Sequence, residues 1–230
     1  MLKNEQINLK VVEQVALALE EINEEVIFIG GAVVSLYATD KGAEQPRPTS
    51  DIDVSVQIGS YSGMELLRNK LAAKKIFPAS SEKVIYRYIY QEITIDFIPV
   101  EDTQLGPTNR WLKPGFKKAL TIKINETPIR ILPVGLFLAT KWEAYKNRGS
   151  DPRTSHDFED IIYVIDNNMN LIDEISHADP YVKVYLKEMG REILSNPSVN
   201  EIIECHINPY IAVERAQRVI GKLKQILSLE

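Results

Sequence analysis

The chain is most informative at Arg47-Pro48-Thr49-Ser50-Asp51-Ile52-Asp53-Val54-Ser55-Val56, where a proline-containing loop gives way to an alternating segment. From Asp51 onward, polar and apolar residues alternate, which is the period of a strand with one buried face. Asp51 and Asp53 therefore point the same way, while Ile52 and Val54 face the core. At about 3.3 Å per residue the two acids are separated by roughly 7 Å along the backbone, close enough to bind one pair of metal ions.

A second motif lies upstream of these acids. Val26-Ile27-Phe28-Ile29 is a short apolar strand that runs into Gly30-Gly31, and residues 32–37 have the spacing of a helix. Glycine removes the side chain that would keep a phosphate away from the backbone, and the N-terminus of a helix favours an anion. The sequence therefore predicts that a phosphate binds at this turn and that metal binds at the acids.

A third acid is predicted on a later strand. Residues 92–98 alternate so that Ile93, Ile95 and Phe97 share one face and Asp96 lies on the other, where it would stand beside the first two carboxylates. Each motif alone also has an ordinary structural explanation, because acids often occupy solvated strand faces and tight turns need glycine. The prediction therefore depends on the order of the motifs along the chain.

In that order the motifs resemble the signature of the polymerase-β-like nucleotidyltransferase superfamily, here Gly30-Gly31, Asp51-Ile52-Asp53 and Asp96. Residues 26–167 are more specifically similar to bacterial nucleotidyltransferase toxins of the AbiEii/AbiGii type and their uncharacterised relatives. The other phrases that carry this resemblance are Arg47-Pro48-Thr49-Ser50, Asn109-Arg110-Trp111, Leu138-Ala139-Thr140-Lys141-Trp142-Glu143-Ala144 and Ser155-His156-Asp157-Phe158-Glu159-Asp160-Ile161.

The resemblance implies an α+β, mixed α/β fold in which a small mixed β-sheet is flanked by helices. Residues 1–132 would form the nucleotidyltransferase core, and residues 133–230 a helical part that closes the nucleotide cleft. The implied reaction transfers a nucleoside monophosphate from a nucleoside triphosphate to an acceptor hydroxyl or phosphate, with release of pyrophosphate. Asp51, Asp53 and Asp96 would be catalytic and would bind two Mg²⁺ ions. Carboxylate oxygens suit Mg²⁺, and the sequence has no His/Cys cluster at zinc spacing.

The residues that the resemblance implies for nucleotide binding are Gly30, Gly31, Ser50, Lys141, Arg148 and Asp157. Residues 133–148 are predicted to form one helix, on which Lys141 and Arg148 share a stripe and a cation could hold the triphosphate. The alternative is a solvent-facing Lys141 whose stem packs on Trp142. Asp157 also has an alternative role, because Thr154-x-x-Asp157 matches a capping pattern at a helix start.

The resemblance suggests an acceptor as well. In the toxin members the acceptor is thought to be RNA, often the 3′ end of a tRNA, and an antitoxin protein would be a partner. Many of these relatives carry Lys or Arg just before the acid that corresponds to Asp157, whereas this chain has His156. Two alternatives therefore stay open: a nucleotide-binding regulatory or partner-binding module without transfer activity, and transfer to a small molecule such as an antibiotic hydroxyl.

Composition sets broad limits on function. The 230 residues are 44% hydrophobic and 26% charged, as in ordinary globular proteins, and the net charge of −5 argues against a general nucleic-acid coat. One acid-free stretch, between Thr103 and Ile124, would either meet phosphates or form a solvated helix face. Its basic residues are Arg110, Lys113, Lys117, Lys118 and Lys123.

The ends and the single cysteine complete the sequence-based expectations. The N-terminus has no apolar signal region and no segment is long and apolar enough to span a bilayer, so we expect a cytoplasmic protein with no membrane partner. Cys205 cannot form an internal disulfide, and we expect it to be a small buried apolar residue.

Overall fold

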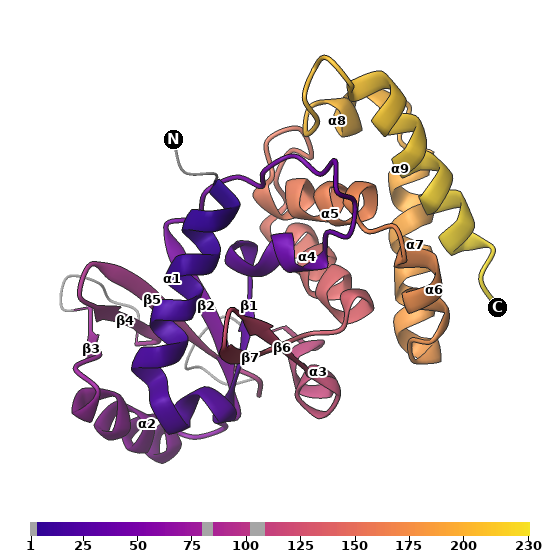
Figure 1. The fold of residues 1–230 in the computed structure, drawn as a ribbon. Helices are drawn as coiled ribbons and strands as arrows, with labels where there is room; N and C mark the ends of the chain where they lie inside the picture. Colours follow the sequence, from indigo (N-terminus) through magenta and orange to yellow (C-terminus); the bar gives the residue numbers. More distant parts are fainter. Residues whose placement is uncertain (1–3, 80–84, 102–108) are drawn as a thin grey trace. The chain divides into compact units, whose positions relative to one another are not determined.

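The computed structural model describes residues 4–79, 85–101 and 109–230. The chain forms two compact units: the first comprises Met1–Val33 and Arg47–Pro133, and the second comprises Val34–Pro46 and Val134–Glu230. The fold is mixed α/β, with one sheet flanked by helices, as predicted. Figure 1 shows the elements in chain order.

The first unit is built on a mixed sheet with the strand order β3-β4-β5-β2-β1-β7-β6. Its strands are β1 (Val26–Ile29), β2 (Asp51–Val56), β3 (Phe77–Pro78), β4 (Arg87–Tyr90), β5 (Ile93–Pro99), β6 (Leu120–Ile124) and β7 (Thr127–Ile131). β2 pairs parallel with β5 and β1 pairs parallel with β7, whereas the other neighbouring strands are antiparallel.

Helices cover this sheet. They are α1 (Asn4–Leu19), α2 (Tyr61–Ala73) and α3 (Leu112–Lys118), with the 3₁₀ helices η1 (Glu20–Glu25) and η2 (Gly31–Tyr37), the last of which continues into the second unit. α1 turns Val12, Val15 and Leu19 inward and packs against β7 (Figure 1). β1 is buried along its whole length, as expected for a central strand covered on both faces.

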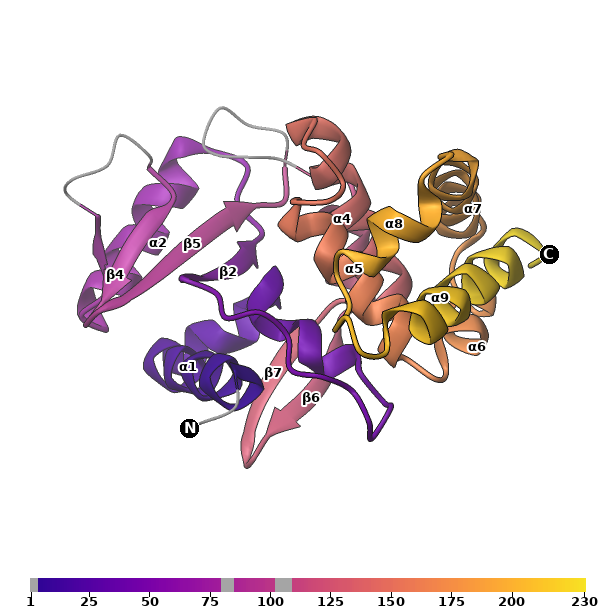
Figure 2. The same cartoon turned by 90° about the horizontal axis from the view of Figure 1, so that it is seen from above.

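The second unit is helical. It contains α4 (Val134–Arg148), α5 (His156–Asn167), α6 (Leu171–Ser176), α7 (Pro180–Ser195), α8 (Val199–Glu204) and α9 (Ala212–Leu227). α4 packs on α5 and α7, and α9 packs on α5, α7 and α8 (Figure 2). The core of this unit is mainly apolar, with Phe137, Phe158, Ile161 and Leu186 almost completely buried, although Lys141, Asp157 and Asp160 are buried as well.

Residues 34–46 belong to the helical unit although they precede most of the sheet in sequence. Tyr37 packs on Phe137 with ring centroids 4.3 Å apart. Asp40 pairs with Arg215 and Arg218 of α9, at 3.5 and 2.8 Å. These contacts fasten an early segment of the chain to its last helix.

The helix expected over residues 32–37 is present, as the tight 3₁₀ helix η2, and one other local expectation is wrong. The amide of Ala38 closes η2 by donating to the Ser35 carbonyl at 3.1 Å, three residues back. Neighbouring valines at 33 and 34 are β-branched and disfavour a longer α-helix. Cys205 is exposed rather than buried, because it follows the end of α8, whose buried face is formed by Ile202 and Ile203.

The start of α5 also differs from its predicted capping pattern. Ser155 is the cap, and its hydroxyl accepts from the Phe158 amide at 3.3 Å. Thr154 lies in the preceding turn, where its amide donates to the Asp151 carbonyl at 3.1 Å. Asp157 is therefore in the first turn of the helix but is not the partner of a Thr154 cap.

Candidate active site

Two of the predicted catalytic acids, Asp51 and Asp53, lie on one face of β2. Their side chains are partly exposed, whereas Ile52 and Val54 are buried. The alternation along the strand therefore places the carboxylates on one side and the aliphatic side chains in the core. Both acids belong to a strand inside the sheet, which fixes their backbone positions.

The third acid comes from the neighbouring strand. β5 runs parallel to β2, and Asp96 is the register partner of Asp53. Adjacent strands are about 4.8 Å apart, so these two acids are immediate neighbours on one face of the sheet. Asp96 is 5% exposed, and Ile95 and Phe97 on either side of it are completely buried on the opposite face. Ile95 and Phe97 therefore face the core as expected, whereas Asp96 is buried as well, so burial does not alternate along this strand.

A residue that sequence reasoning missed, Arg87, lies among these acids. Arg87 is the register partner of Asp96 in the antiparallel pair of β4 and β5. Its Nε donates to Asp96 Oδ1 at 2.7 Å and its Nη2 donates to Asp96 Oδ2 at 2.8 Å. The same Nη2 lies 3.9 Å from Asp51 Oδ2. A bidentate guanidinium–carboxylate pair is among the strongest polar contacts in proteins.

In the structure, two of the acids, Asp96 and Asp51, lie beside this arginine. Within residues 4–79, 85–101 and 109–230, no group of three or more His, Cys, Asp or Glu side chains is assembled to hold a metal ion. The three acids share a face and adjacent backbone positions, but the guanidinium of Arg87 engages both oxygens of Asp96. The three acids therefore share one face of the sheet, and the Asp96 carboxylate is engaged by an arginine.

The glycine turn lies directly against these acids. Gly30 has a φ of +77°, and a Cβ added to it would lie 2.1 Å from Asp53 Oδ2. The register of β1 and β2 explains this closeness, because Ile29 is opposite Asp53. Gly30 therefore serves two purposes: it permits a left-handed backbone, and it leaves space for the Asp53 carboxylate.

A second arginine lies at the other residue of the turn. A Cβ on Gly31 would be 2.7 Å from Arg47 Nη2 and 2.9 Å from Thr49 Cγ2. The buried Asn8 of α1 holds this segment, since its Nδ2 donates to the Arg47 carbonyl at 3.1 Å and its Oδ1 accepts from the Thr49 amide at 3.3 Å. Arg47 belongs to the sequence motif that precedes β2, but no spacing rule assigns its side chain to the turn.

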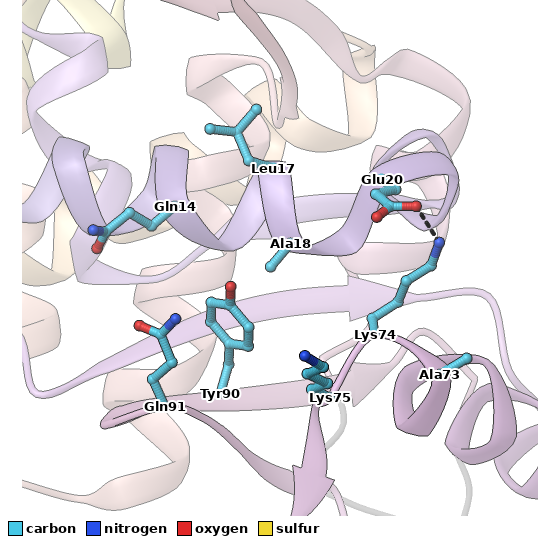
Figure 3. A pocket seen from close by; sticks show the side chains of 9 residues that line it. All are labelled: Gln14, Leu17, Ala18, Glu20, Ala73, Lys74, Lys75, Tyr90 and Gln91. Carbon is cyan, nitrogen blue, oxygen red and sulfur yellow. Dashed lines mark hydrogen bonds and ion pairs between the residues drawn. The ribbon is translucent and has the colours of Figure 1, made fainter.

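The hollows of the first unit, within its described residues, include two that lie beside α1. A small one of about 170 Å³ is lined by Ser50 and Asp51 beside Asn8 of α1. A larger one of about 650 Å³ lies between α1 and the ends of α2 and β4 (Figure 3). In the larger hollow Lys74 is already paired with Glu20, and none of the three predicted catalytic acids lines it. Asp51 lines the smaller hollow, but so do Ile52 and Ile93 of the opposite face, and Asp53 and Asp96 do not line it.

The remaining predicted nucleotide ligands form a cluster in the second unit. Lys141 is buried, and its Nζ lies 2.7 Å from Asp160 Oδ2 and 3.2 Å from Asp157 Oδ1. Arg148, at the end of α4, also donates to Asp157. The alternative of a solvent-facing Lys141 is therefore wrong, because the ammonium is withdrawn from water and compensated by two buried carboxylates.

Asp160 was not singled out from the sequence, although a signal was present. It follows Asp157 by three residues on α5, and residues three apart lie on the same face of a helix. A lysine paired with one of these acids is thus within reach of both. His156, in contrast, is exposed, with its Nδ1 3.3 Å from Glu159 Oε2.

The basic stretch is described from residue 109 onward, and its earlier part lies outside the described residues. Trp111 is buried, and the Arg110 guanidinium lies 5.1 Å from the centre of its ring. Lys113 pairs with Glu101 at 2.9 Å. Trp111 therefore anchors α3 in the core rather than presenting its ring to a base.

Comparison with known proteins supports the fold. The chain is similar to the crystal structure of an antigenic nucleotidyltransferase-like protein from Paracoccidioides brasiliensis, with a TM-score of 0.53 and 16% sequence identity. The similarity covers 87% of this chain and 94% of that protein. No family model matches the sequence, and no curated protein matches it. At this identity the likeness establishes a nucleotidyltransferase-like fold.

In the part of the chain that the structure describes, no helix combines the length and apolarity needed to cross a membrane.

Proposed function

We propose that this chain is a Mg²⁺-dependent nucleotidyltransferase that moves a nucleoside monophosphate from a nucleoside triphosphate to an acceptor hydroxyl or phosphate and releases pyrophosphate. The observation that carries the proposal is the register of β2 and β5, which brings Asp96 beside Asp53 with Asp51 on the same strand face. The fold shared with a nucleotidyltransferase-like protein supports it.

In this proposal the acids of this face hold a hard divalent cation. Asp51, Asp53 and Asp96 would hold it, because carboxylate oxygens are the donors that Mg²⁺ prefers. The turn is shaped around one of these donors, since the space a Cβ of Gly30 would need is occupied by Asp53 Oδ2. When bound, Mg²⁺ supplies charge neutralisation for the triphosphate and favours ionisation of the attacking hydroxyl.

The roles of the other residues follow from their positions. Gly30 and Gly31 leave room for the Asp53 carboxylate and the Arg47 guanidinium, so in this proposal the cation of Arg47 meets a phosphate at the turn. Ser50, on the exposed approach to β2, provides a hydroxyl donor next to the small hollow. Asp96 accepts the proton of the attacking hydroxyl in this proposal.

Lys141, Arg148 and Asp157 enter the proposal only through the resemblance of the sequence to AbiEii-type enzymes. Lys141 and Arg148 both contact Asp157, so a triphosphate bound by them would share these cations with that carboxylate. The same resemblance suggests RNA, in particular a tRNA end, as acceptor and an antitoxin as partner. His156 is the departure that favours testing a small-molecule acceptor in parallel.

A nucleotide-binding module without transfer activity is the second candidate. The observation that favours it is the bidentate pair of Arg87 and Asp96, which occupies the carboxylate that transfer would use as a base. Such a protein would bind a triphosphate and release no pyrophosphate.

The experiment that separates these functions uses the purified protein, Mg²⁺ and each of four α-labelled nucleoside triphosphates. Total RNA and a panel of aminoglycosides serve as acceptors, with pyrophosphate and acceptor label followed together. We expect label on one acceptor class, and its loss in the Asp51→Asn/Asp53→Asn variant. Asp173→Asn is the matched control, because its side chain is 79% exposed on α6.

Either result is informative. Transfer that persists in the Asp51→Asn/Asp53→Asn variant would contradict the proposed chemistry. Triphosphate binding by calorimetry without pyrophosphate release would support the binding module instead.

A further inference from the structure

The position of Arg87 has a consequence for metal binding. Its guanidinium contacts two acids of the cluster, Asp96 through two hydrogen bonds and Asp51 at 3.9 Å. The Arg87 side chain is 25% exposed and that of Asp96 is 8% exposed, so the pair is largely shielded from water. Shielding strengthens the attraction between them relative to a surface ion pair.

The geometry also fixes which oxygens are engaged. Nε and Nη2 of Arg87 take one oxygen of Asp96 each, in the fork arrangement that only arginine provides. A divalent cation held by Asp96 needs these same oxygens. It would also sit close to a fixed positive charge, since the register of β4 and β5 keeps Arg87 opposite Asp96 whatever its side chain does.

We propose that Arg87 is a positioning residue that competes with a divalent cation for Asp96, so that metal is held fully only when the guanidinium releases this carboxylate. The inference rests on the proposed function, because it concerns the same acids. It assigns this site a weak affinity for metal in the absence of nucleotide. A triphosphate would relieve the competition, since its oxygens could accept the hydrogen bonds that the Arg87 guanidinium otherwise donates to Asp96.

The first test is a Mn²⁺ titration of nucleotide-free, full-length protein followed by electron paramagnetic resonance. Arg87→Gln removes the competing charge, so we expect it to bind Mn²⁺ at least about tenfold more tightly than the wild type. Arg87→Lys keeps the charge and should stay within about threefold of the wild type. A variant that merely disturbed the sheet would bind metal more weakly, which is the opposite direction.

The matched control is Arg130→Gln. Arg130 is also a strand arginine of the first unit, but its guanidinium donates to the carbonyls of Glu24 and Phe116 rather than to an acid. We expect its Mn²⁺ affinity to equal that of the wild type. Unchanged or weaker binding by a folded Arg87→Gln variant would overturn the inference.

A second measurement uses the wild type and does not depend on the folding of any Arg87→Gln protein. The Nε–H signal of Arg87 in a ¹⁵N spectrum, assigned by its absence in Arg87→Lys, should move as Mg²⁺ saturates the site. A signal that stays in place while calorimetry shows Mg²⁺ bound would overturn the inference.

The outcomes also separate this inference from the proposed function. If the wild type binds Mn²⁺ and the Asp51→Asn/Asp53→Asn variant does not, the metal site stands, and only the Arg87→Gln affinity decides the competition. If neither the wild type nor Arg87→Gln binds Mn²⁺, the metal-dependent function and the inference both fail.

Discussion

At Gly30, backbone conformation and the chemistry of the candidate site coincide. Its φ of +77° disfavours any side chain, and a Cβ there would lie 2.1 Å from Asp53 Oδ2. An alanine in the left-handed conformation costs about 1–2 kcal/mol. We expect Gly30→Ala to lower the free energy of unfolding by more than this, because Asp53 must also move. The variant should lose more transfer activity than its loss of stability alone explains, since the displaced Asp53 is a predicted catalytic acid.

The chain supplies its own control for this prediction. Gly149 has a similar φ of +61°, with no atom within 4 Å of an added Cβ. Gly149→Ala should therefore cost only the backbone term of about 1–2 kcal/mol. Urea unfolding of both variants and the wild type measures the difference. Equal losses of stability would show that the contact with Asp53 contributes nothing.

Single residues also show where sequence reasoning stopped. Asp51 and Asp53 could be placed on one face because the period of a strand is local. Arg87 could have been found by counting across the hairpin: it lies four residues before Gln91, and Asp96 lies four residues after Glu92. That count needs a turn at Gln91-Glu92, and nothing in these two residue types signals one. Gln91 adopts its φ of +54° without being glycine or asparagine.

At the scale of elements, the start of α5 gives a sharp comparison between neighbouring residues. Ser155 accepts the Phe158 amide as the cap of the helix, whereas Thr154 belongs to the turn before it. Ser155→Ala should lower the free energy of unfolding by about 1 kcal/mol. Thr154→Ala should stay within about 0.5 kcal/mol of the wild type. Thermal and urea unfolding check both values. A larger loss of stability for Thr154→Ala than for Ser155→Ala would show that Thr154 is the cap, as the sequence pattern predicts.

The elements themselves were more predictable than their pairing. The alternation in β2 and β5 and the apolar run of β1 gave strands at the right places, because one face of each must be buried. The parallel register that puts Asp96 opposite Asp53 is set by tertiary packing. A shift of one residue would have turned Asp96 to the other face, and no local pattern specifies how far one strand slides along another.

At the scale of the molecule, the division of the chain could not be read from the sequence. A contiguous boundary at 132/133 was the natural expectation, yet residues 34–46 lie in the helical unit with residues 134–230. The segment has no composition that marks it as part of a helical core. Its assignment depends on contacts that span more than a hundred residues, such as the 2.8 Å pair of Arg218 with Asp40.

This arrangement predicts the behaviour of a fragment that contains residues 134–230 alone. Without residues 34–46, Phe137 loses the ring of Tyr37, and Arg215 loses the carbonyl of Gly42 at 2.9 Å as well as Asp40. Arg215 keeps Asp166, and Asp40 is only partly buried, so the loss combines the packing of Tyr37 with partly shielded polar contacts. A domain is stabilised by only about 5–15 kcal/mol, so several such losses together weaken the tertiary packing. We expect the fragment to have helical circular dichroism but a poorly dispersed NMR spectrum.

A synthetic peptide of residues 34–46 should restore the dispersed spectrum when it is added in trans, and its pH dependence provides the control. The pKa of Asp40 is held below its ordinary value of 3.8, first by the Gly42 amide and then by Arg218. A carboxyl whose pKa is lowered on folding stabilises the native state above its ordinary pKa, and this contribution is lost as the pH falls through the lowered value. Rescue by the native peptide should therefore be strong at neutral pH and should fade below about pH 4. An Asp40→Asn peptide should bind more weakly throughout, and its rescue should not fade over this pH range.

A fragment that unfolds cooperatively without any peptide would instead show that residues 134–230 fold independently, and that residues 34–46 only lie on their surface.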